Sequence, residues 1–188
     1  MQLNFNRKEY ERKFLQPGGY VGKIVNVGME GETIKVFFDI AQGEFKDVYL
    51  KEYQQAGGGT KFVPDKWNKK AVVNFNFQYT GAKYAFADLL NYLEESNQAF
   101  KWNNETNDLK GKLVGVIYKK NIYTDKFGDE KEGTDFPSFT TVKNIAEHKY
   151  SIEPVDKNKS SSSASTNPSV SNTGTSDSFN IMEDDIQF

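Results

Sequence analysis

The chain has 188 residues with a formal net charge of −2, and 27% of its residues are charged. Its mean hydropathy is −0.71 and it contains no long apolar run, so its composition predicts no membrane-spanning helix. The absence of cysteine excludes disulfides, thiolate zinc sites and a cysteine nucleophile. These features lead us to expect a cytoplasmic protein.

The charges are unevenly distributed along the chain. Residues 1–159 hold all 24 basic residues and 22 of the 26 acidic ones, a net charge of +2, whereas residues 160–188 hold four acids and no base. The sequence pI of about 5.6 argues against a simple basic nucleic-acid binder. This whole-chain value averages two different parts, a mildly basic segment over residues 1–159 and an acidic segment over residues 160–188.

Residues 1–16 mix charged and apolar side chains, and we assign them to an N-terminal arm without a function. The next stretch, residues 18–53, is predicted to form three short strands joined by tight turns. Side chains alternate across a strand, so each of the last two runs has an aliphatic face and a second face. The second faces carry Lys35, Phe37 and Asp39 in one run, and Tyr49, Lys51 and Tyr53 in the other.

Exposed rings and ammonium groups on one face would suit the stacking and charge of single-stranded nucleic acid. The alternative is that these aromatics are core residues or ordinary strand formers, because Phe and Tyr favour strands. The loop over residues 54–70 adds Trp67 beside several lysines. Trp67 is interpreted either as a stacking platform or as a plug in the core.

The remaining elements follow in order. Residues 72–79 alternate as an extended segment, and residues 83–97 are predicted to be a helix because Phe86, Leu89, Leu90 and Leu93 form one apolar stripe. Two more strands are predicted over residues 111–120 and 139–146. Between them lies an acidic loop that we expect to be a solvated surface loop, because its spacing fits no calcium site.

Five short strands with one helix after the third is the order of the OB-fold, a mainly β, five-stranded Greek-key barrel that binds oligonucleotides or oligosaccharides. We expect this domain over residues 17–153, with the helix between strands 3 and 4. Residues 154–178, rich in serine and threonine, are predicted to be a disordered linker. Residues 179–188 combine acids with apolar anchors, a pattern typical of a peptide that docks into a basic-rimmed pocket.

The last five residues, Asp184-Asp185-Ile186-Gln187-Phe188, are similar to the acidic tip of bacterial single-stranded-DNA-binding proteins, which usually ends Asp-Ile-Pro-Phe. The body resembles the single-stranded-DNA-binding proteins encoded by phages. The stretches that carry this resemblance are residues 17–25, 38–46 and 111–115. It implies an OB-fold, a role in replication or recombination in the host cytoplasm, and recruitment of replication or recombination proteins by Asp184, Asp185, Ile186 and Phe188.

We therefore expect a non-enzymatic protein that coats single-stranded DNA without strong sequence preference, with no cofactor and no metal, and with possible self-association. The DNA-contacting residues are predicted to be Lys35, Phe37, Lys46, Tyr49, Lys51, Tyr53, Lys66, Trp67, Lys69 and Lys70. Two alternatives stay open. One is a barrel that binds an oligosaccharide or a protein. The other is a metal-dependent nuclease that uses the acidic loop.

Overall fold

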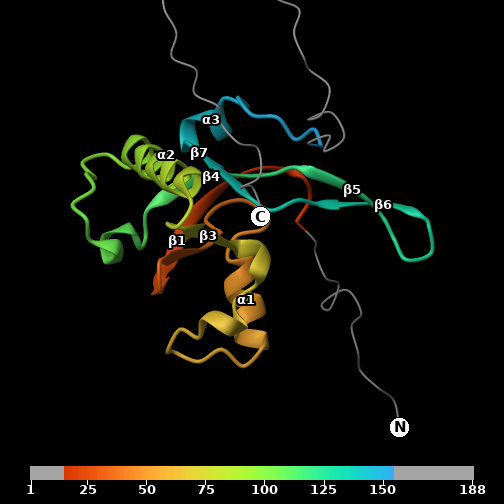
Figure 1. Cartoon of the computed structure of the whole chain (residues 1–188), viewed down its shortest axis with the longest axis horizontal. Helices are drawn as coiled ribbons and strands as arrows, with labels where there is room; N and C mark the ends of the chain where they lie inside the picture. Colours follow the sequence, from red (N-terminus) through yellow and green to blue (C-terminus); the bar gives the residue numbers. More distant parts are fainter. Residues whose placement is uncertain (1–14, 155–188) are drawn as a thin grey trace, which may run out of the picture. The chain divides into compact units, whose positions relative to one another are not determined.

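The computed structural model describes residues 15–154, which form a mainly β structure (Figure 1). Five antiparallel strands make one curled sheet in the order β3-β2-β1-β4-β7. Their bounds are β1 Gly18–Glu30, β2 Thr33–Ile40, β3 Val72–Asn76, β4 Leu113–Tyr118 and β7 Ser138–Thr140. The first two strands predicted within residues 18–53 and the strand predicted over residues 111–120 are thus present, and the extended segment predicted over residues 72–79 contains a further sheet strand, β3.

Strand β1 organises the sheet because it pairs with both β2 and β4. Its register against β2 shifts between Ile24 and Asn26, which places a bulge at Val25. A bulge bends a strand and increases its twist. This bend lets the 13 residues of β1 curl around the core, with one half paired to each neighbour.

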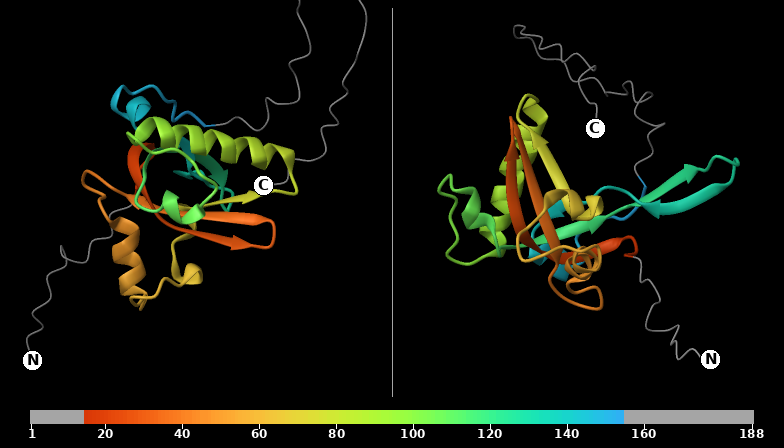
Figure 2. Two further views of the ribbon diagram at one scale, coloured as in Figure 1. Left: turned by 90° about the vertical axis from the view of Figure 1, so that its left-hand side faces the viewer. Right: turned by 90° about the horizontal axis from the view of Figure 1, so that it is seen from below.

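The core lies on the inner side of this curled sheet, where the aliphatic face of β2 was predicted to be. The alternate residues Ile34, Val36, Phe38 and Ile40 are all buried. Helix α2, Thr80–Ser96, covers part of the sheet with its apolar stripe and confirms the predicted helix (Figure 2). Phe86 of α2 packs against Phe75 of β3, and the centroids of the two rings lie 5.3 Å apart.

The third predicted strand is wrong, because residues 48–55 form helix α1, Val48–Gln55. The carboxylate of Asp39 on β2 accepts the backbone N–H groups of Tyr49 and Leu50 at 3.1 and 2.9 Å. These donors open the helix and have no partner within it. Tyr49 and Tyr53 are four residues apart, a spacing that also puts two rings on one face of a helix.

The predicted last strand, residues 139–146, is only partly correct. Strand β7 ends at Thr140, and helix α3, Val142–Ala146, follows at once. Thr141 starts this helix, since its Oγ1 accepts the N–H of Asn144 at 3.1 Å. Three short 3₁₀ turns complete the helical elements of residues 15–154: Pro64–Lys66, Lys69–Ala71 and Thr106–Leu109.

The acidic loop is not a loop but a two-stranded antiparallel ribbon of β5, Lys120–Thr124, and β6, Glu130–Thr134. It extends away from the five-stranded sheet (Figures 1 and 2). No helix within residues 15–154 is long and apolar enough to cross a membrane. The predicted linker beyond residue 154, the tip, and residues 1–14 of the arm lie outside the described residues.

Candidate nucleic-acid interface

The four rings predicted to stack on bases are buried. Phe37, Tyr49, Tyr53 and Trp67 have only 2–4% of their surface exposed. The expectation that they form an outward aromatic face is wrong, and the groove built on them is not present. The physical reason is the α1 segment, which is a helix folded over the outer side of β2 rather than a third strand beside it.

Three of these rings, those of Phe37, Tyr53 and Trp67, pack in one cluster with Phe62 from the loop that follows α1. The centroid of the Phe62 ring lies 5.0 Å from that of Phe37, 5.7 Å from that of Tyr53 and 5.3 Å from that of Trp67. The backbone at Gly58 lies so close to the Tyr53 ring that a Cβ there would overlap it. The alternative interpretation of Trp67 as a core plug is the one that this cluster supports.

Tyr49 also has a structural role. Its hydroxyl lies 2.9 Å from the hydroxyl of Tyr118, which donates to the C=O of Lys70 at 2.8 Å. Since Tyr118 uses its one proton on Lys70, Tyr49 must donate to Tyr118. Burial raises the pKa of Tyr49 to about 12 and raises the pKa of Tyr118 further. Both hydroxyls therefore stay protonated and join α1 to β4.

The predicted lysines remain on the surface, but several have partners in the protein. Lys35 forms an ion pair with Glu30. The ammonium group of Lys66 donates to the C=O of Gly57 at 2.8 Å. The other predicted lysines are exposed at Lys46, Lys51, Lys69 and Lys70. They do not surround the buried rings with an open cationic groove.

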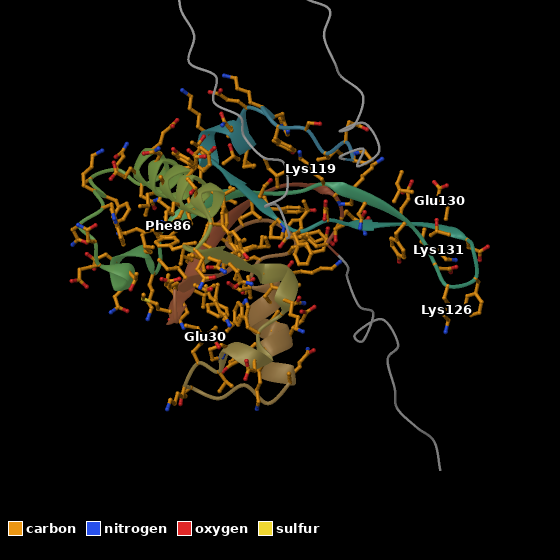
Figure 3. All side chains as sticks on the ribbon, in the orientation of Figure 1. Glu30, Phe86, Lys119, Lys126, Glu130 and Lys131 are labelled. Atoms are coloured by element: carbon orange, nitrogen blue, oxygen red, sulfur yellow. The ribbon has the colours of Figure 1, made fainter. Side chains whose placement is uncertain are left out.

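Lys70 connects the predicted residues to the ribbon. Its ammonium group donates to Oγ1 of Thr134 on β6 at 2.8 Å. Two of the predicted lysines, Lys69 and Lys70, therefore lie at the base of the β5–β6 ribbon, where Lys119 precedes β5 (Figure 3).

The ribbon exposes the rings that the sequence analysis missed. Tyr123 is 50% exposed, Phe127 at the tip is 78% exposed, and Phe136 beyond β6 is 76% exposed. Tyr123 is paired across the ribbon with Lys131 and lies beside Gly133. The signal was present as a short run of strand-favouring residues over 120–124, but the surrounding acids led to its interpretation as a loop.

The acids of the ribbon shape its turn. Oδ1 of Asp125 accepts the N–H groups of Phe127 and Asp129 at 2.8 and 3.1 Å. The Lys131 ammonium group lies 3.6 Å from the Asp125 carboxylate and 3.7 Å from that of Asp129. Lys126 lies over the Phe127 ring, 4.9 Å from its centroid. Within residues 15–154, no three carboxylate, histidine or cysteine side chains are placed to hold a metal ion.

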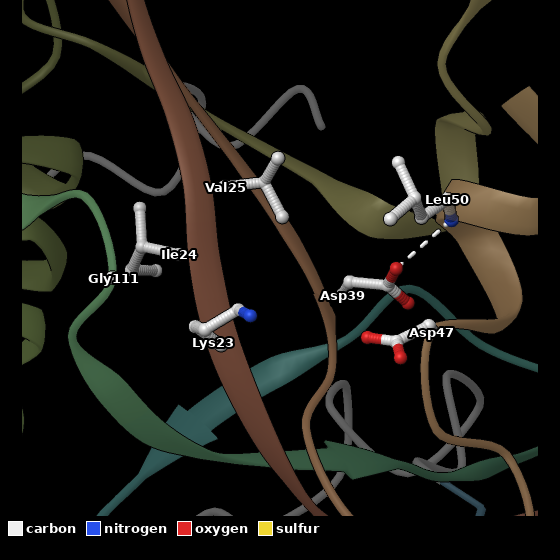
Figure 4. Close-up of a pocket in the computed structure, with 7 residues that line it drawn as sticks. All are labelled: Lys23, Ile24, Val25, Asp39, Asp47, Leu50 and Gly111. Atoms are coloured by element: carbon white, nitrogen blue, oxygen red, sulfur yellow. Dashed lines mark hydrogen bonds between the residues drawn. The ribbon is translucent and has the colours of Figure 1, made fainter.

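A separate cleft of about 300 Å³ lies between β1, β2 and the start of α1 (Figure 4). Its charged lining consists of Lys23, Asp39 and Asp47. Burial raises the pKa of Asp39, and the N–H bonds from Leu50, Tyr49 and Ile40 oppose this rise. Because the Asp39 carboxylate already accepts three backbone bonds, it serves to anchor α1. Two carboxylates against one ammonium group make this cleft a poor site for a phosphate.

No protein-family model matches the chain, and no curated protein matches it in sequence. The geometry of residues 15–154 and the sequence patterns are therefore the basis for any proposal about function.

Proposed function

We propose that the chain binds single-stranded DNA without strong sequence preference, through an OB-type domain that uses the β5–β6 ribbon. Three sheet strands, then helix α2, then two sheet strands is the order of OB-fold elements along a chain. The ribbon occupies the connection between the fourth and fifth sheet strands. In OB-folds that connection is one of the loops that contact oligonucleotides.

The observation that carries the proposal is the exposure of Tyr123 and Phe127 on the ribbon and of Phe136 just beyond β6, together with four lysines in the same part of the chain. Rings of this kind stack on any base, which gives affinity without base selection, at about 1–3 kcal/mol for each stacked base. These lysines are Lys120, Lys126 and Lys131 of the ribbon and Lys119, which precedes β5. Lys131 forms ion pairs with Asp125 and Asp129. The phosphate contacts therefore come from the other three lysines, together with Lys69 and Lys70 at the ribbon base.

The broader biological role rests on the resemblance to phage and bacterial single-stranded-DNA-binding proteins. We propose that the protein is not an enzyme and that it acts in DNA replication or recombination. Its C-terminal tip, with Asp184, Asp185, Ile186 and Phe188, would recruit partner proteins. The acidic and apolar composition of the tip supports this part of the proposal.

Fluorescence anisotropy of a labelled oligothymidylate, titrated with the full chain at several salt concentrations, tests the proposal. We expect binding whose logarithmic affinity falls with log salt by about 0.7 for each phosphate contact. Replacing both Tyr123 and Phe127 by alanine should weaken binding by roughly 5- to 150-fold for each base that no longer stacks. Tyr84→Ala is the matched control, because Tyr84 is 71% exposed on α2.

Absence of binding at low salt would refute the proposal and favour the alternative of an oligosaccharide or protein ligand. If the ribbon variant and Tyr84→Ala lost equal affinity for the oligonucleotide, the ribbon would not be the DNA-binding site. In the same samples, the oligonucleotide should stay intact after incubation with magnesium. Its degradation would instead favour the nuclease alternative.

A further inference from the structure

The hydrogen-bond register of the β5–β6 ribbon fixes which backbone groups face outward. The N–H of Asp135 donates to the C=O of Lys119, and the N–H of Asp125 donates to the C=O of Asp129. In an antiparallel pair, hydrogen-bonded and non-hydrogen-bonded positions alternate. The bonded positions of the first strand are therefore 119, 121, 123 and 125. The backbone groups of residues 120, 122 and 124 point away from β6.

The outer edge of β5 is already used for pairing at one end. The N–H of Lys120 donates outward to the C=O of Ile152 at 2.9 Å, which confirms the direction deduced from the register. Among residues 15–154, no acceptor meets the next two outward N–H groups, those of Ile122 and Thr124. The edge beyond Lys120 thus has free donors and acceptors next to an Ile122 side chain that is 46% exposed.

The two edges of the ribbon differ in how they are protected. Strand β6 carries Glu130, Lys131 and Glu132 in succession, and charges on an edge strand discourage pairing. The stretch Asn121–Thr124 of β5 has no charge and no proline, and it contains Ile122 and Tyr123. An isolated two-stranded ribbon is only marginally stable in water, so an additional strand would stabilise it. The open edge is the one on β5.

We propose that the β5 edge pairs with the same edge of a second copy of this chain, antiparallel and centred on Tyr123. Ile122 then exchanges two backbone hydrogen bonds with Thr124 of the second copy, and the two-fold axis repeats these bonds. The two Tyr123 side chains form the central non-hydrogen-bonded pair, where side chains approach most closely. This contact is isologous, so it closes as a dimer and does not extend into a filament.

The charges along this pairing favour a second copy as the occupant. Asn121 lies opposite Asp125 of the second copy, and Ile122 lies opposite Thr124, so no like charges meet over residues 121–125. The one like-charge pair, Lys120 with Lys126 of the second copy, lies just outside this segment. The corresponding pairing of two β6 edges centred on Lys131 would put Lys131 against Lys131 and Glu130 against Glu132. Like charges directly opposite are destabilising. The centre of the β5 edge is therefore free of like-charge pairs, whereas the centre of that β6 pairing consists of them.

The inference is independent of the proposed DNA binding and is tested without DNA. Sedimentation equilibrium of the full chain, from low to high micromolar concentration, should show a monomer–dimer equilibrium. Ile122→Pro removes an outward N–H while leaving the β5–β6 bonds in place, and proline is tolerated at such edge positions. Because two of the four bonds across the axis are lost, the dimerisation constant should fall by about tenfold or more.

Glu132→Pro is the matched control. Glu132 is paired with Ile122 across the ribbon, and its N–H also points outward, but from the β6 edge. This variant should dimerise like the parent chain. A parent chain that is monomeric at every concentration would overturn the proposal, as would a dimer that Ile122→Pro leaves unchanged or that both proline variants weaken equally. Should Ile122→Pro fail to fold by circular dichroism, Thr124→Pro removes the other outward N–H of the same edge.

Discussion

Replacing Asp39 by alanine should strongly destabilise the fold, because one carboxylate closes three backbone hydrogen bonds. Oδ1 accepts the N–H groups of Ile40 at 2.8 Å and Tyr49 at 3.1 Å, and Oδ2 accepts that of Leu50 at 2.9 Å. The first two sites are buried and the third is partly buried, so water can replace the carboxylate only at Leu50. The residue at the N-terminal end of α1, Asp47, makes no side-chain cap of its own.

The expected loss follows from these three donors. Each buried N–H left without a partner costs about 1–3 kcal/mol. Two such groups give about 2–6 kcal/mol, from which relief of the buried negative charge must be subtracted. We therefore expect Asp39→Ala to lower the free energy of unfolding by about 3 kcal/mol. Urea denaturation followed by circular dichroism measures this loss directly.

Asp39→Asn provides the sharper comparison. Its amide oxygen still accepts from Ile40 and Tyr49, so only the bond to Leu50 is lost, and the cost should be about 1 kcal/mol. The reasoning fails if Asp39→Ala costs less than about 1 kcal/mol, or if the two variants are equally unstable. In the second case, the charge itself rather than the acceptor geometry would hold α1 in place.

The same pair of proteins gives a pH dependence. Burial raises the pKa of Asp39 above its ordinary value of 3.8, so the folded state binds this proton more tightly than the unfolded state does. Stability then decreases as pH rises through the window between the two pKa values. The stability difference between the parent chain and Asp39→Asn should therefore be larger below that window than above it. An advantage that grows with pH would show the opposite pKa shift.

Two further pairs of substitutions test the packing around α1. Gly58→Ala should lower the melting temperature because its Cβ overlaps the Tyr53 ring, at a cost of about 1–3 kcal/mol, whereas Gly59→Ala meets open space and should be neutral. Equal effects of these two changes would argue against close packing of this loop on Tyr53. Tyr118→Phe should cost more in urea denaturation than Tyr49→Phe, because only the former leaves the C=O of Lys70 without its donor; the reverse order would contradict the assigned proton directions.

The sheet could be predicted in large part from side-chain alternation. Strand β2 and helix α2 have periodic apolar patterns that leave one choice of buried face. Residues 48–53 could not be assigned in this way, because Tyr49 and Tyr53 satisfy both a strand face and a helix face. What selects the helix is Asp39, a residue ten positions away along the chain whose carboxylate caps its first turn. Such tertiary contacts override a short local pattern.

The error at residues 48–53 also explains the error about the candidate site. Phe37 alternates outward on β2, as predicted, but α1 and its loop cover that face and turn Phe37 into a core residue. Conversely, the rings of the ribbon were overlooked, because acids near Tyr123 and Phe127 suggested a solvated loop. Asp125 and Asp129 are in fact engaged in the ribbon turn and with Lys131. Local charge therefore predicted exposure correctly but not structure.

DNA binding and dimerisation are both proposed to involve Tyr123. Their contributions can be distinguished by measuring the binding of short and long oligonucleotides. Residues directly opposite each other share one face of a sheet, so pairing through β5 would put both Tyr123 rings side by side on one continuous surface. Tyr123→Ala should then weaken the binding of both short and long oligothymidylates. Ile122→Pro should spare a short oligonucleotide that contacts one copy and weaken only one long enough to span both. If Ile122→Pro weakened both lengths equally while Glu132→Pro did not, the β5 edge itself would have to contact DNA, and the dimer would not be needed to explain the weaker binding.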